Sequence, residues 1–96
     1  MNNRQGGYVK VTMLVVWQIP FQPLDPEELI NSQFAQSLGI AMEEMNGSKW
    51  GLGRGYRGVV FQAAPAAKAQ EIGEQIVGYL SAQYGTDAMA QPVGME

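Results

Sequence analysis

The feature that most constrains the fold is a β-branched run over residues 8–19, YVKVTMLVVWQI, which ends before Pro20. Such a run predicts a strand. Its odd-numbered positions are all apolar, whereas its even-numbered positions are mixed and include Leu14 and Val16. Because side chains alternate between the two faces of a strand, the odd face is predicted to pack against helices. Leu14 and Val16, on the even face, are predicted to need cover that the chain does not fully supply.

A helix is predicted after this strand and its proline-rich connector. Asp25, Pro26 and two glutamates form a helix start, because Asp caps a helix N-terminus and Pro fits its first position. Apolar residues then recur every three or four positions, at Ile30, Phe34, Leu38, Ala41 and Met45. This spacing predicts one continuous helix that ends near Asn46 and Gly47.

The second half of the chain repeats the order of strand and then helix. Residues 56–63 are predicted to form a strand, and a helix is predicted from Pro65 to a stop at Gly85. Its apolar stripe consists of Ala69, Ile72, Ile76 and Leu80. Two shorter strands are predicted near residues 49–52 and 86–95.

These elements predict a single α+β domain over residues 1–96. Their order matches the split βαβ, or ferredoxin-like, arrangement, a two-layer sandwich in which two helices cover one face of a mostly antiparallel sheet. Residues 1–7 are predicted to form an N-terminal arm, residues 46–55 a glycine-rich hairpin, and residues 86–96 a C-terminal tail or short edge strand. Because two helices cover only one face, we expect the other face or a free edge to contact another molecule.

The composition removes most familiar catalytic designs. The chain has no histidine and no cysteine, so it lacks imidazole and thiolate metal ligands, thiol nucleophiles and Ser-His-Asp sites. Neither Glu43 with Glu44 nor Glu71 with Glu74 has a spacing that brings two carboxylates into a buried pair. We therefore expect no cofactor, no metal and no catalytic residue, and the composition argues against an enzyme.

The sequence also predicts where the protein works. Its net charge is −3, which does not favour attraction to anionic membranes. The longest near-apolar run, residues 11–19, is too short to cross a bilayer, and no basic start with an apolar leader is present. We expect a cytoplasmic protein without membrane contact.

The stretch from Asn46 to Gln62 differs chemically from the rest of this acidic chain. It contains three basic residues, three aromatic residues and no carboxylate. A tryptophan among glycines beside a lysine is typical of an interface anchor. We therefore predict a contact surface that consists of Lys49, Trp50, Arg54, Tyr56 and Arg57, together with Leu14 and Val16 of the first strand.

Two patterns within this stretch bear on nucleotides. Residues 53–58 read GxGxxG, but a strand and not a helix is predicted to follow, which argues against a dinucleotide site. Residues 54–61 partly resemble the RNP1 octapeptide of RNA-recognition motifs, although Arg57 and Gly58 depart from it. Seven of the nine acidic residues fall on predicted helices and five of the six basic residues fall off them. Because such segregation could place the basic residues together away from the acidic helices, single-stranded nucleic acid is an alternative partner.

The leading functional hypothesis is a small non-catalytic protein that acts through protein–protein contact. Its partner is predicted to be itself, as a homodimer or larger assembly, or a larger protein. One alternative is binding of single-stranded nucleic acid through the basic and aromatic hairpin. Another is a small-ligand site or cofactor-free enzyme with an apolar cavity, because the length and layout are similar to those of the dimeric α+β barrel group.

Overall fold

The computed structural model describes residues 9–18 and 24–95. The strands are β1 (Val11–Gln18), β2 (Met42–Glu44), β3 (Tyr56–Ala63) and β4 (Ala88–Met95). The helices are α1 (Pro26–Ile30), α2 (Gln33–Ser37), α3 (Gly47–Trp50) and α4 (Ala66–Tyr84). The predicted arm over residues 1–7, both outer ends of the predicted first strand and its connector lie outside the described residues.

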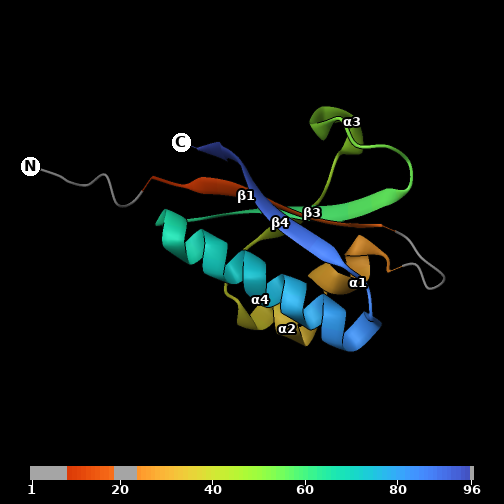
Figure 1. Cartoon of the computed structure of the whole chain (residues 1–96). Helices are drawn as coiled ribbons and strands as arrows, with labels where there is room; N and C mark the ends of the chain where they lie inside the picture. Colours follow the sequence, from red (N-terminus) through yellow and green to blue (C-terminus); the bar gives the residue numbers. More distant parts are fainter. Residues whose placement is uncertain (1–8, 19–23, 96) are drawn as a thin grey trace, which may run out of the picture.

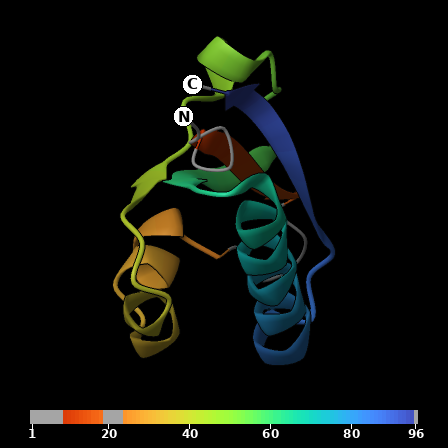
Figure 2. The same ribbon diagram turned by 90° about the vertical axis from the view of Figure 1, so that its left-hand side faces the viewer.

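The four strands form one antiparallel sheet in the order β2-β3-β1-β4. Strands β1 and β3 occupy its centre and pair along their full lengths, from Val11 opposite Ala63 to Gln18 opposite Tyr56. Helices α1, α2 and α4 pack on one side, here called the inner face, whereas α3 lies on the other side, the outer face (Figures 1 and 2). The predicted α+β class, with helices packed on an antiparallel sheet, is confirmed.

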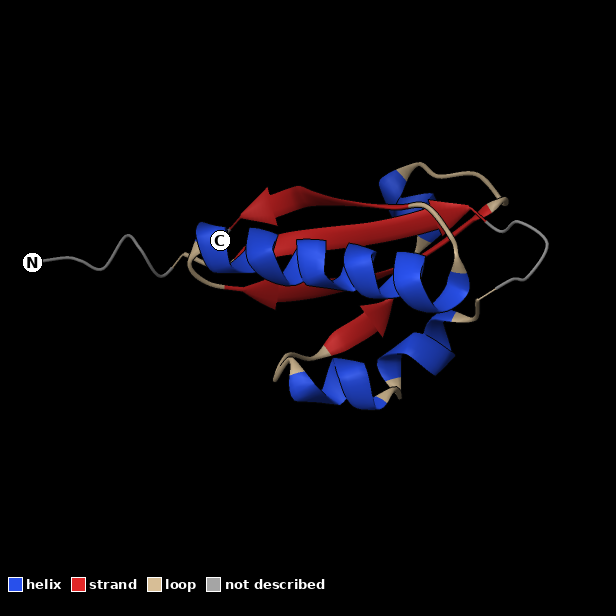
Figure 3. Cartoon of the chain, turned by 60° about the horizontal axis from the view of Figure 1, so that its bottom comes forward, coloured by secondary structure: helices blue, strands red, loops and turns tan. Residues whose placement is uncertain are grey.

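The hydrophobic core lies between the inner face and the helices. The odd-numbered side chains of β1 enter it, and Val11, Met13, Val15 and Trp17 are each at most 3% exposed. They meet the predicted apolar stripe of α4, which runs along the sheet (Figure 3). Gly73 permits close packing, because a Cβ there would lie 2.9 Å from Cβ of Ala90. The predicted inward face of the first strand is confirmed.

Three aromatic rings join α2 to α4. Phe34 stacks on Tyr79 with ring centroids 4.0 Å apart, and Tyr79 meets Tyr84 edge-on at 6.3 Å. Burial raises the pKa of the Tyr84 hydroxyl, and the neighbouring Tyr79 and Glu28 raise it further. This cluster packs α2 against α4 in the helix layer.

The prediction of one helix from residue 26 to residue 46 is wrong after its first turn. Its start is confirmed, since Asp25 accepts a hydrogen bond from the Glu27 amide at 3.0 Å. Ser32 then starts a second helix, because its hydroxyl accepts from the Ala35 amide at 3.0 Å and donates to the Leu29 carbonyl at 2.7 Å. Gly39, with φ of 69°, follows α2, and the chain continues as β2. The apolar spacing continues through these breaks, which explains the error.

The other predicted elements have mixed outcomes. The strand over residues 56–63 is confirmed, and so is the helix between Pro65 and Gly85. Where a C-terminal tail or a short edge strand was predicted, residues 88–95 form a strand of eight residues, as long as β1 and β3. The predicted strand near residues 49–52 is wrong, because this segment forms α3. The predicted hairpin over residues 46–55 is instead a long connection with one helical turn, which joins the antiparallel neighbours β2 and β3.

Candidate interaction surface

The outer face is partly covered by residues 45–55, here called the roof segment (Figure 1). Leu14 and Val16 lie on this face and are only 1% and 8% exposed. Met45 of the roof segment lies beside Val16, since a Cβ on Gly58 would be 3.1 Å from Sδ of Met45 and 3.2 Å from Cγ1 of Val16. The structure therefore corrects the expectation that Leu14 and Val16 need another molecule for cover: within this chain both are already buried.

Local hydrogen bonds explain why the roof segment forms a helical turn and not the predicted strand. The Asn46 side-chain oxygen accepts from the amides of Ser48 and Lys49, at 3.1 and 3.2 Å. Such N-capping favours a helix start. Gly51 closes the turn with φ of 76°, a conformation that glycine adopts at little cost. The segment is thus shaped mainly by bonds within itself.

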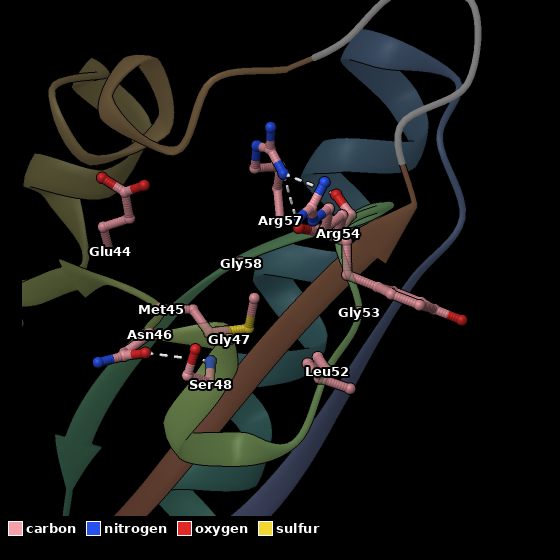
Figure 4. A pocket seen from close by; sticks show the side chains of 11 residues that line it. Glu44, Met45, Asn46, Gly47, Ser48, Leu52, Gly53, Arg54, Arg57 and Gly58 are labelled. Atoms are coloured by element: carbon pink, nitrogen blue, oxygen red, sulfur yellow. Dashed lines mark hydrogen bonds between the residues drawn. The ribbon is translucent and has the colours of Figure 1, made fainter.

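The roof segment divides the predicted contact surface between two hollows. The first, here called the groove, has a volume of about 620 Å³ and lies on the outer face beside α3. Its chemically distinctive lining residues are Lys10, Thr12, Glu43, Lys49, Trp50 and Gln62. The second, here called the basin, has a volume of about 420 Å³ and is lined by Glu44, Met45, Arg54, Tyr56 and Arg57 among others (Figure 4). The predicted surface is therefore not one continuous site.

Two of the polar side chains in the basin, those of Tyr56 and Arg57, form hydrogen bonds within the chain. Arg57 Nη1 donates to the carbonyl oxygens of Arg54 and Tyr56, at 3.1 and 3.0 Å. The Tyr56 hydroxyl accepts from Nε2 of Gln18 at 3.0 Å. Glu44 lies apart from the two arginines in Figure 4. The two bonds of Arg57 stabilise the turn before β3, so this arginine has a structural role.

The groove combines an aromatic ring with cations. Nζ of Lys49 lies 4.9 Å from the centroid of the Trp50 ring, a cation–π contact. Trp50 is half-buried and lines the groove, while Lys10 and Lys49 are exposed. On its floor, Gln62 Nε2 donates to the Thr12 hydroxyl at 3.2 Å. Glu43 adds one carboxylate, so the two lysines leave the charged groups of the lining with a net positive charge.

The partial resemblance to the RNP1 octapeptide can be followed along β3. Tyr56 pairs with Gln18, an even-numbered residue of β1, and so lies on the outer face. Phe61 pairs with Met13 on the inner face and is 2% exposed. Phe61 is therefore a core residue, and Tyr56 is the aromatic residue that β3 presents outward.

The predicted segregation of charge is present in altered form. Glu43 and Glu44 lie on β2 and not on a helix, because the long helix does not form. Asp25 caps α1, and the acidic residues Glu27, Glu28, Glu71 and Glu74 lie in the helix layer. Most described carboxylates are thus on the side of the sheet opposite the groove.

The two edges of the sheet differ sharply. Strand β2 has three residues, of which Glu43 and Glu44 are charged and exposed. Strand β4 has eight residues, none of them charged, and its Met89 is 61% exposed. Pro92 and a register shift opposite Thr12 and Met13 interrupt the second half of β4, so its regular part is residues 88–91. Sequence reasoning did not select Met89; the absence of charge in the final strand was the signal that could have found it.

Within the residues that the structure describes, no group of three or more His, Cys, Asp or Glu side chains could hold a metal ion. No helix in this part of the chain is long and apolar enough to span a membrane. Comparison with protein-family models, with curated proteins and with solved structures finds no match for this chain.

Proposed function

We propose that this chain is a small non-catalytic protein that acts through protein–protein contact, and that its contact is the outer edge of β4 pairing with β4 of a second copy. The observation that supports this most is an uncharged edge strand of eight residues with Met89 61% exposed. An open edge presents unpaired backbone N–H and C=O groups, and another strand satisfies them best.

The contrast between the two edges favours β4 over β2. Natural sheets protect their edges by making them short and by placing charges on them. Strand β2 has both protections, in its three residues and in Glu43 and Glu44. Strand β4 has only Pro92 and the register shift, which lie in its second half. Residues 88–91 therefore form the regular, uncharged stretch at which a partner strand can pair.

A second copy fits this stretch better than a charged partner. Antiparallel pairing of identical strands about a two-fold axis places no like charges opposite each other, because β4 contains none. An axis at Met89 brings the two Met89 side chains together and removes both from water. The combined sheet would have eight strands.

The cover on the outer face also favours pairing through the β4 edge over face-to-face packing of two sheets. The roof segment lies over that face (Figures 1 and 2), and Leu14 and Val16 of the same face are already buried. Face-to-face packing of two sheets would require the roof segment to move. Pairing through β4 leaves it in place.

The strand order supports assignment of the fold to the ferredoxin-like arrangement. Strand β3 lies between β1 and β2, and β1 lies between β3 and β4. Two interleaved βαβ units of this kind define the split βαβ pattern. The chain departs from the simplest version by using two short helices, α1 and α2, in the first crossover and by adding α3 between β2 and β3.

Sedimentation velocity over a concentration series tests the proposal with one variant and one matched control. Met89→Lys adds one positive charge at an exposed position of β4, so two paired copies would place two ammonium groups side by side. Glu44→Gln changes the net charge by the same amount at the opposite edge. We expect a dimer for the wild type and for Glu44→Gln, and for Met89→Lys a monomer whose circular dichroism spectrum matches that of the folded wild type.

Two outcomes would contradict the proposal. One is a wild-type protein that stays monomeric at near-millimolar concentration. The other is a Met89→Lys dimer with the same dissociation constant as the wild type, which would place the contact elsewhere.

A further inference from the structure

The groove beside α3 differs in chemistry from the β4 edge. Its lining brings together the Trp50 ring, the ammonium groups of Lys10 and Lys49, and the Thr12 and Gln62 side chains. Lys49 and Trp50 come from α3, whereas Lys10 precedes β1, so the tertiary fold brings the two lysines to one hollow. Its volume of about 620 Å³ falls within the range of small-ligand sites.

From this arrangement we infer that the groove binds single-stranded nucleic acid, with a base stacked on Trp50 and backbone phosphates beside Lys10 and Lys49. Sites for single strands combine a positively charged groove with an aromatic ring on which a base stacks. The Lys49 ammonium lies over the Trp50 ring, 4.9 Å from its centroid. A base that stacks on this face takes the place of the ammonium, which then contacts the neighbouring phosphate. This activity goes beyond protein contact and uses a different surface.

The acidic total of the chain does not oppose binding at this site. The acidic residues of α1 and α4 lie in the helix layer, with the sheet between them and the groove. Exposed charges are largely screened beyond about 8 Å at physiological salt. Glu43 is the carboxylate that lines the groove itself. Because the Glu43 carboxylate repels phosphate, Glu43→Gln should tighten binding, whereas loss of either lysine should weaken it.

Fluorescence anisotropy with a labelled oligothymidylate, on the full chain, tests the inference. Each phosphate neutralised on a single strand contributes about −0.7 to the slope of log affinity against log salt, so two lysine contacts give about −1.4. Lys10→Ala with Lys49→Ala should remove this slope and most of the binding. Trp50→Ala should weaken binding by about tenfold, and Trp50→Phe should restore part of that loss.

The charge-matched control is Arg54→Ala with Lys68→Ala, which removes two positive charges that lie outside the groove. This control should keep the wild-type affinity and salt slope. Circular dichroism checks that each variant is folded, and Met89→Lys should still bind, which separates this inference from the dimer.

The inference is overturned if the wild type does not retain the oligonucleotide at low salt. It is equally overturned if the control pair Arg54→Ala with Lys68→Ala weakens binding as much as the loss of Lys10 and Lys49. A third contradicting result is that heparin, a polyanion without bases, binds as well as the oligonucleotide and Trp50→Ala binds normally.

Discussion

The two faces of the sheet are covered in different ways. The inner face meets three helices, of which α4 has nineteen residues, and its core side chains Val15, Ile76 and Leu80 are fully buried. The outer face has the roof segment, whose helix α3 has four residues and no buried side chain. Stability is therefore concentrated at the inner face. The groove and the basin lie at the outer face, where both are lined by residues of the roof segment.

Because of this difference, we expect mutations at the inner face and mutations in the roof segment to have different effects on stability. Loss of inner packing should unfold the whole domain, because the core links α4 to every central strand. Loss of a bond within the roof segment should open that segment alone, as expected for a region with few buried apolar contacts. Such local opening would suit a surface that binds other molecules.

The largest effect is expected from Ile76→Ala. Ile76 is 0% exposed in the inner core, and its truncation leaves a cavity that should lower the free energy of unfolding by about 3 kcal/mol. Urea denaturation monitored by circular dichroism measures this change. Val77→Ala, at a half-buried neighbouring position of α4, should cost clearly less; equal losses would mean that the inner core is not as tightly packed as its burial indicates.

A smaller effect is expected from Gly58→Ala at the outer face. A Cβ at this position would lie 2.5 Å from the Val15 carbonyl oxygen and would also press on Met45 and Val16. Overpacking of this kind should cost about 2 kcal/mol. Gly53→Ala is the matched control, because a Cβ there meets nothing within 4 Å. Equal melting temperatures for the two variants would show that the outer cover is loose enough to move aside.

The smallest effect is expected from Asn46→Ala. This variant removes the side-chain oxygen that caps α3, at a cost of about 1 kcal/mol. Hydrogen exchange at the roof-segment amides should accelerate by about fivefold, while the urea midpoint of the domain stays nearly unchanged. Asn31→Ala at the end of α1 is the control and should not alter exchange in the roof segment. A fall in the urea midpoint as large as that of Ile76→Ala would contradict the separation of the two faces.

Elements with strong local signals were predictable from sequence. Strand β3 and helix α4 lie within a residue of their predicted limits, because β-branched residues mark the strand, and Pro65 and Gly85 mark the ends of the helix. Strand β2 was not predictable in this way. Its three residues lie between Ala41 and Met45, which continue an apolar helical spacing. They form a strand because β3 offers them backbone partners at Phe61, Val60 and Val59.

The candidate site was predictable only in its residue types. Sequence reasoning selected Lys49 and Trp50, but it grouped them with Arg54 and Arg57, which line a different hollow. It did not select Lys10 or Met89. Lys10 lies far from Lys49 in sequence, and the exposure of Met89 depends on β4 becoming an edge.

The sequence by itself determined which side of β1 faces the helices, because alternation of apolar residues along a strand is a local property with a fixed period. It likewise determined that histidine and cysteine chemistry is absent. The tertiary structure alone decided that Leu14 and Val16 are buried within this chain, and that β2 and β4 are the edge strands of the described sheet. These outcomes depend on pairing between strands that are distant in sequence. The free energy of such pairing depends on both strands, so it cannot be inferred from either segment alone.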